Sequence, residues 1–191
     1  MSGTVIFKYG TMFCGKSMDL IGNYENLRYG GKAVAVYKPA YDTREDDFVI
    51  KSRSHALSLQ ATPLEPDTHP PMPDEDYVFI DEGQFMTAHN ADWLEVLKLA
   101  GKTVIVWGLL RDYRGKVFDG TVALLAHADS LVEMKTVCNH PGCMKKATHH
   151  VLSIDGVVQT GGSGLHVGDM EFQVVCAIHY HESTRNPVTN Q

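Results

Sequence analysis

The eight residues at positions 10–17, with the sequence GTMFCGKS, constrain the fold more than any other feature of this chain. They match the pattern G-x-x-x-x-G-K-[ST], whose glycines let the backbone curl so that successive N–H groups point at phosphate oxygens. Such a loop lies between a strand and a helix, where the positive end of the helix faces the phosphates. Residues 4–9 are rich in β-branched and aromatic side chains, and residues 16–28 repeat apolar side chains every three or four positions. The sequence therefore predicts a strand, a phosphate-binding loop (P-loop) and a helix, in this order.

Strand patterns and helix patterns continue to alternate after the P-loop. Apolar runs predict strands at residues 33–37, 77–80 and 103–109, and a helical pattern lies at residues 91–100. Five prolines between residues 62 and 75 predict a surface loop without regular structure. Strands that alternate with helices are typical of an α/β fold with a parallel sheet.

Two adjacent carboxylates, Asp81 and Glu82, follow the apolar strand at residues 77–80. In P-loop proteins an aspartate at this place acts through Mg²⁺, and a neighbouring glutamate can accept a proton from the attacking nucleophile. The P-loop and the acidic pair together predict a nucleotide hydrolase or a kinase. They leave open which of the two it is.

Three of the four cysteines lie close to histidines in the last third of the chain. Cys176 and His179 have the two-residue gap that lets both side chains reach one zinc ion. Cys138 and Cys143 have a four-residue gap. We predict a structural zinc site made of these four residues, with His140 as the alternative to Cys138.

Length and charge restrict the remaining function classes. The 191 residues have room for one ordinary domain and a small appendage, which we place at residues 1–137 and 138–191. The 17 basic and 23 acidic residues give a net charge of −6, which argues against a nucleic-acid partner. The N-terminus lacks the pattern of a signal peptide, and no apolar run is long enough to span a bilayer. We therefore expect a cytoplasmic protein without a membrane partner.

The P-loop is followed by further segments whose order and spacing are specific. DEGQF at residues 81–85 is the most specific of them. The others are Lys38 with Pro39, Asp42 with Thr43 and Arg44, GKTVIV at 101–106, Gly108 with Leu109, and DYRGKVF at 112–118. Together with the cysteine clusters, these segments resemble the type II, zinc-containing thymidine kinases over nearly the whole chain.

The resemblance implies a P-loop NTPase-type parallel sheet flanked by helices, with a small C-terminal zinc-binding lasso domain. It implies transfer of the ATP γ-phosphate to the 5'-hydroxyl of thymidine, and also of deoxyuridine, in nucleoside salvage. The implied metals are Mg²⁺ and structural Zn²⁺. A homotetramer and feedback inhibition by thymidine triphosphate are further expectations from the family.

The same resemblance implies roles for single residues around ATP. Glu82 is expected to be the general base, and Lys16 and Arg44 complete the catalytic set. Ser17 and Asp81 would hold Mg²⁺ directly or through water. The residues expected to contact the nucleotide and its metal are Gly10, Thr11, Met12, Phe13, Cys14, Gly15, Lys16, Ser17, Asp42, Asp81 and Gln84.

For the nucleoside, the resemblance implies apolar side chains around the base and a glycine-rich lasso that reads the pyrimidine edge with backbone groups. The expected substrate-binding residues are Met12, Phe85, Leu109, Tyr113, Phe118, Thr160, Gly161, Gly162 and Phe172. The lasso corresponds to residues 157–175, is longer here than in the usual form, and has Phe172 where the family commonly has Tyr. Its length leaves two readings open, altered base specificity or disorder without substrate.

A second function class is a P-loop ATPase whose zinc element binds nucleic acid. Such an element needs clustered Lys and Arg side chains to contact phosphates. After residue 137 the chain offers only Lys145, Lys146 and Arg185. The sequence therefore favours the kinase over this alternative.

Overall fold

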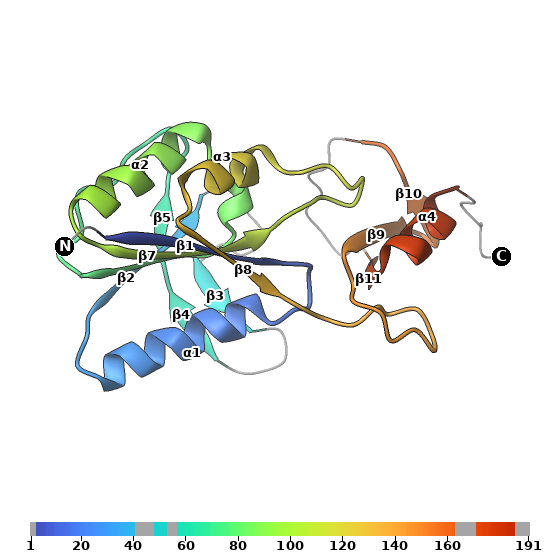
Figure 1. The fold of residues 1–191 in the computed structure, drawn as a ribbon, viewed down its shortest axis with the longest axis horizontal. Helices are drawn as coiled ribbons and strands as arrows, with labels where there is room; N and C mark the ends of the chain where they lie inside the picture. Colours follow the sequence, from blue (N-terminus) through green and yellow to red (C-terminus); the bar gives the residue numbers. More distant parts are fainter. Residues whose placement is uncertain (1–2, 41–47, 53–56, 163–170, 186–191) are drawn as a thin grey trace.

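The computed structural model describes residues 3–40, 48–52, 57–162 and 171–185. Its main element is a six-stranded sheet with the strand order β5-β2-β6-β7-β1-β8, in which every neighbouring pair is parallel (Figure 1). The strands are β1 (Thr4–Gly10), β2 (Val34–Pro39), β5 (Thr62–Leu64), β6 (Tyr77–Ile80), β7 (Thr103–Leu109) and β8 (Ser130–Met134). This sheet, flanked by helices, confirms the predicted α/β class.

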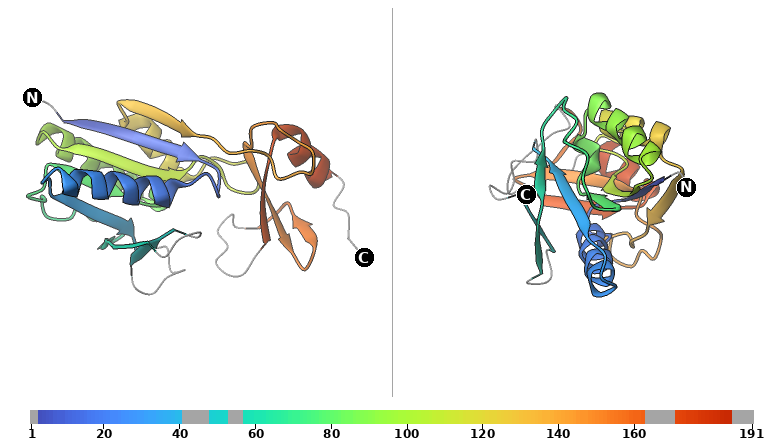
Figure 2. Two further views of the ribbon diagram at one scale, coloured as in Figure 1. Left: turned by 90° about the horizontal axis from the view of Figure 1, so that it is seen from below. Right: turned by 90° about the vertical axis from the view of Figure 1, so that its left-hand side faces the viewer.

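Helices cover both faces of the sheet. Helix α1 (Lys16–Tyr29) lies on one face, and α2 (Ala88–Leu99) and α3 (Asp119–His127) lie on the other (Figures 1 and 2). Successive residues of a strand point to opposite faces, so one strand can feed two apolar cores. In β7, Val106 packs in the core under α2 and α3, and Trp107 packs in the core under α1. Both side chains are fully buried.

The segment at residues 62–75 corrects one prediction. Thr62–Leu64 forms β5 at the edge of the main sheet, paired with β2 on one side only. An edge strand tolerates Pro63 because its outer edge pairs with no other strand of the described sheet, so a missing N–H at that edge costs no hydrogen bond of the sheet. The short hairpin of β3 (Val49–Lys51) and β4 (Ser58–Gln60), which precedes it, was not predicted.

A second, three-stranded antiparallel sheet lies beyond the carboxyl ends of the parallel strands (Figures 1 and 2). Its order is β10 (Val157–Gln159), β9 (His149–Ile154) and β11 (Glu171–Val175), and helix α4 (Ala177–Arg185) follows. The predicted lasso therefore begins and ends in regular strands that pair with β9. The division into domains at residues 137 and 138 stays a prediction.

The helices offer one further observation. In the described ranges, none of them has both the length and the apolar character that crossing a membrane would require.

Candidate active site and metal centre

The P-loop joins β1 to α1 as predicted. Gly10 is the last residue of β1, and Lys16 is the first residue of α1. Gly15, between them, has a φ of 85°, a left-handed conformation that favours glycine. In the described structure no side chain caps the start of α1, and Lys16 Nζ donates a hydrogen bond to the backbone oxygen of Thr11 at 2.8 Å. The amides at this helix start are therefore directed toward a site that suits an anion.

Asp81 follows β6 and is almost fully buried, with 3% of its surface exposed. Its Oδ1 has no hydrogen-bond partner in the described part of the chain, and the same holds for Oγ1 of Thr11. Burial raises the pKa of Asp81 to about 7, and the charge of Glu82 adds to this effect. The ammonium groups of Lys16 and Lys38 act in the opposite direction. A buried carboxylate with an unpaired oxygen fits a bound cation, so Asp81 is suited to Mg²⁺.

The position of the Glu82 side chain is set by its backbone conformation and by a hydrogen bond from Gln84. The backbone of Glu82 is left-handed, with a φ of 50°, and the short 3₁₀ turn Gly83–Phe85 follows. The buried amide of Gln84 donates from Nε2 to Glu82 Oε2, and its Oε1 accepts the backbone N–H of Leu109 at 2.8 Å. The Glu82 carboxylate is thus connected to the end of β7 through one side chain. The expectation that Gln84 contacts the nucleotide stays untested, and its observed partners are protein groups.

Glycines allow this turn to pack tightly against the sheet. A Cβ added at Gly83 would lie 2.3 Å from Cγ1 of Val106. A Cβ added at Gly120, on α3, would lie 2.6 Å from the backbone oxygen of Gln84. Both distances are far below van der Waals contact, so larger residues would displace the turn that carries Glu82.

The predicted nucleoside residues gather in part. Phe85 and Phe118 form an edge-to-face pair with ring centroids 5.9 Å apart. Tyr113 is buried, and its hydroxyl donates to the backbone oxygen of Gly161. Arg114 Nη1 donates to the backbone oxygen of Gly162 at 2.7 Å. The start of the lasso is therefore tied to the loop after β7.

The remaining predicted substrate residues are placed individually. Met12 is half-buried in the P-loop, after the end of β1, and Leu109 is half-buried at the end of β7. Thr160 is exposed just after β10, and Phe172 is half-buried on β11 opposite Leu152. Asp42 and Arg44 lie outside the described residues.

Two residues near the site were not in the predicted set. Arg114 forms an ion pair with Asp112 at 2.7 Å besides its bond to the lasso. His150, on β9, accepts the backbone N–H of Met12 at its Nε2, at 2.8 Å. Arg114 lies within the DYRGKVF segment, which was a usable signal. No sequence signal indicated the contact of His150 with the P-loop, because a histidine near a cysteine cluster is more readily assigned to a metal site.

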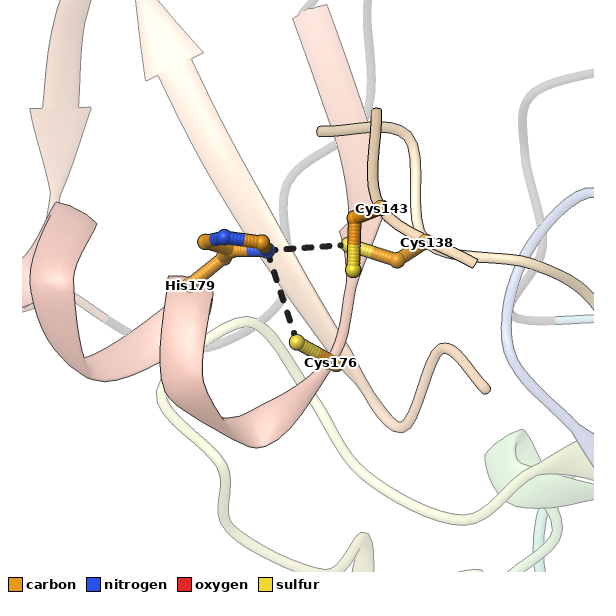
Figure 3. Close-up of side chains that lie close together, drawn as sticks. All are labelled: Cys138, Cys143, Cys176 and His179. Carbon is orange, nitrogen blue, oxygen red and sulfur yellow. Dashed lines mark hydrogen bonds between the residues drawn. The ribbon is translucent and has the colours of Figure 1, made fainter. Parts of the chain in front are cut away.

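The four predicted zinc ligands come together in the structure. The ligand atoms of Cys138, Cys143, Cys176 and His179 all lie within 4.8 Å of one another. Nδ1 of His179, on α4, is 3.3 Å from Sγ of Cys138 and 3.4 Å from Sγ of Cys176 (Figure 3). Zinc bonds of about 2.0 to 2.3 Å in a tetrahedron require ligand spacings of this size. The donor set, three thiols and one imidazole, could hold zinc.

The alternative ligand His140 has a different position. Its ring stacks on the ring of His179, with centroids 3.7 Å apart and planes 10° apart. Its Nδ1 lies 3.1 Å from the backbone oxygen of Pro141. Within the described ranges, the group of ligand atoms that could hold a metal therefore contains Cys138 and not His140.

Comparison with known proteins agrees with this arrangement. The family model described as thymidine kinase matches residues 3–180. A thymidine kinase of Streptococcus gordonii is 32% identical over 188 residues, which cover 94% of this chain and 97% of the relative. A thymidine kinase of Lactococcus lactis subsp. lactis is 34% identical, with 91% and 95% covered, and one of Enterobacteria phage T4 is 32% identical, with 95% and 97% covered.

The family match spans both sheets, from β1 into α4, and includes the P-loop, the acidic pair and the thiol cluster. These matches do not favour a P-loop ATPase with a nucleic-acid-binding zinc element. The chain belongs to the thymidine kinase family.

Proposed function

We propose that this ATP-dependent thymidine kinase holds the triphosphate on its P-loop and uses Glu82 as the base that activates the thymidine 5'-hydroxyl. One observation carries the proposal: the start of α1, which no side chain of the described residues caps, lies at the same edge of the sheet as Glu82 and the buried Asp81. All three follow the carboxyl ends of two parallel strands, β1 and β6, which are separated by β7, and ligands of open α/β sheets bind at this edge.

The P-loop groups would position the phosphates. Backbone N–H groups at the start of α1 would donate hydrogen bonds to the phosphate oxygens, and Lys16 would exchange its bond to Thr11 for one to the β- and γ-phosphates. Ser17 and Asp81 are the residues that would hold Mg²⁺, which neutralises phosphate charge when bound. The unpaired Oδ1 of Asp81 supports this assignment. Arg44 and Asp42 are retained as proposed contributors from the resemblance.

Glu82 would accept the proton of the 5'-hydroxyl as that oxygen attacks the γ-phosphate. A base contributes to phosphoryl transfer mainly through correct placement. Gln84 supports this placement, since its amide links the Glu82 carboxylate to the backbone of Leu109. We therefore assign Gln84 to the positioning of Glu82.

The nucleoside would lie between the aromatic pair of Phe85 and Phe118 and the start of the lasso. The carbonyls of Gly161 and Gly162 are engaged by Tyr113 and Arg114. Fixing these carbonyls orients the peptide groups of the lasso, which can then read a pyrimidine edge. Deoxyuridine has the same hydrogen-bonding edge as thymidine, so we propose it as a second substrate.

The thiol cluster would hold a structural zinc ion. Four protein ligands complete a tetrahedral shell, and a closed shell leaves no position for a substrate. The homotetramer, the feedback inhibition by thymidine triphosphate and the cytoplasmic location stay predictions from the sequence.

The test is a phosphorylation assay with purified protein, MgATP and a panel of deoxynucleosides, in which thymidine and deoxyuridine should be converted.

Glu82→Gln should lower kcat at least about 10²-fold, because a general base contributes factors of this size. The affinity for MgATP should change less than twofold. Glu25→Gln, an exposed site on α1, is the matched control and should keep full activity. An unchanged kcat in Glu82→Gln would exclude Glu82 as the base.

A further inference from the structure

One hydrogen bond connects the small antiparallel sheet directly to the P-loop. Nε2 of His150, in the middle of the three-stranded sheet, accepts the backbone N–H of Met12 at 2.8 Å. The two residues are separated by 138 positions in the chain. The His150 side chain is buried, with 3% of the residue exposed. A buried contact of this kind constrains the loop as well as the histidine.

The surroundings of His150 keep its ring neutral, which an accepting nitrogen requires. Burial, and then the charge of Lys16, lower the pKa of His150 to about 4. His149 acts in the same direction. Asp112 and a backbone hydrogen bond with Arg111 act in the opposite direction and do not reverse the shift. The ring is therefore uncharged throughout the neutral range.

The partner of His150 lies in the middle of the phosphate-binding element. Met12 is the third residue of the P-loop, and its peptide group belongs to the curl between Gly10 and Gly15. An N–H that is committed to His150 is not available to a phosphate oxygen. The bond instead fixes the orientation of one peptide of the loop before a nucleotide arrives. A loop that is ordered in advance loses less entropy when it binds its ligand.

The strand that carries His150 contacts the elements that carry the candidate metal centre. His150 is opposite Val174 in the pairing of β9 with β11. Strand β11 leads directly into Cys176, and His149 stacks on Tyr180 of α4. The strand that presents the imidazole to the P-loop is therefore braced by the elements that carry the thiol cluster.

From this arrangement we infer that His150 is a positioning residue for the P-loop, which pre-orders the loop for the phosphates of ATP from the second sheet. The inference rests on the proposed role of the P-loop in phosphate binding. His150 itself touches neither phosphate nor metal in this role. It acts through the Met12 peptide.

The experiment measures MgATP binding by calorimetry without thymidine, so that no turnover occurs. His150→Phe keeps a ring of similar size but removes the acceptor, and it should weaken MgATP binding roughly tenfold, a factor that corresponds to about 1.4 kcal/mol. His150→Gln places an amide oxygen near the position of Nε2 and should restore the affinity to within twofold of wild type. His149→Phe, one residue away, is the matched control and should also stay within twofold.

A second measurement does not depend on any variant. Hydrogen exchange of the wild-type protein should show the Met12 amide protected in the absence of nucleotide. Rapid exchange of this amide, or wild-type MgATP affinity in a folded His150→Phe protein, would overturn the inference.

Lys16→Ala separates this result from a failure of the proposed function. If Lys16→Ala abolishes MgATP binding and His150→Phe does not weaken it, only the role of His150 fails, whereas wild-type binding by Lys16→Ala removes the P-loop proposal.

Discussion

The six-stranded sheet buries large apolar side chains on both of its faces, whereas the three-stranded sheet has one small cluster. The cores of the main sheet contain fully buried Trp93 and Trp107 among many other side chains. The small cluster consists of Cys138, Val151, Val175, Cys176 and Tyr180. Two of its five members are thiols of the candidate metal centre.

This difference shows two ways of holding functional groups in place. In the main sheet, packing fixes the strand ends, and the strand ends fix the P-loop and the acidic pair. In the small sheet the apolar cluster has fewer members, and a metal cross-link can add to its stabilising effect. Order in the small sheet should therefore depend on metal, and order in the main sheet on packing.

The largest expected effect is the loss of the metal centre. Cys176→Ser removes one of the four ligands and should abolish zinc binding. Structural zinc sites contribute about 10 kcal/mol or more to the folded state of their ligands, so the small sheet should lose order. Amide exchange of β9, β10 and β11 should then accelerate strongly while β1, β6 and β7 keep their protection. Zinc content and hydrogen-exchange mass spectrometry measure both parts. Cys14→Ser, a thiol outside the cluster, should retain zinc. Normal zinc content and protection in Cys176→Ser would contradict the assignment.

The second effect concerns packing in the main sheet. Leu94→Ala in α2 removes a fully buried side chain from the larger core and should lower the free energy of unfolding by about 2 to 5 kcal/mol. Denaturant unfolding measures the loss, and zinc content should not change. Leu99→Ala in the same helix is the matched control, because Leu99 is 77% exposed, and the cost there should stay below about 0.5 kcal/mol. Equal losses of unfolding free energy in the two variants would contradict the claim that packing of buried side chains stabilises the main sheet.

The smallest effect lies where the two regions meet at the lasso. Tyr113→Phe removes the hydroxyl that donates to the Gly161 carbonyl. One such bond contributes about 1 kcal/mol, so the KM for thymidine should rise roughly fivefold with little change in kcat. Steady-state kinetics provide the measurement. Tyr29→Phe deletes the same hydroxyl at a site that is 98% exposed and should leave the KM unaltered. A KM within twofold of wild type in Tyr113→Phe would show that this contact does not order the lasso.

Most of the main sheet could be predicted, because its strands and helices carry strong local patterns. The strands predicted at residues 77–80 and 103–109 coincide with β6 and β7. Helix α2 begins before the predicted residue 91, since Thr87 and Asn90 form a capping box that starts it at Ala88. The edge strand β5 was missed because Pro63 interrupts its local pattern, although pairing on one side tolerates a proline.

The small sheet was less accessible to prediction. Its strand β10 has three residues, and the glycine-rich sequence around it indicates a loop. The strand forms because β9 offers its backbone as a partner on one side and takes β11 on the other. The pairing of β9 with β11 joins segments that are distant in sequence, so no local pattern encodes it. β9 and β10 instead form a hairpin through Asp155 and Gly156, both left-handed, and this local turn signal was missed.

Neighbouring residues of the chain specify much of its chemistry through local sequence patterns. Residues 10–17 specify a phosphate loop, Asp81 and Glu82 a pair of carboxylates, and Cys176 with His179 half of a metal site. The tertiary structure determines which distant groups meet. It paired Met12 with His150, Gln84 with Leu109, and the pair of Cys138 and Cys143 with the pair of Cys176 and His179. The physical reason is that local patterns fix residue type and spacing, whereas hydrogen bonds and ligand shells require atoms within about 3 to 4 Å, and the packing of two sheets sets those distances.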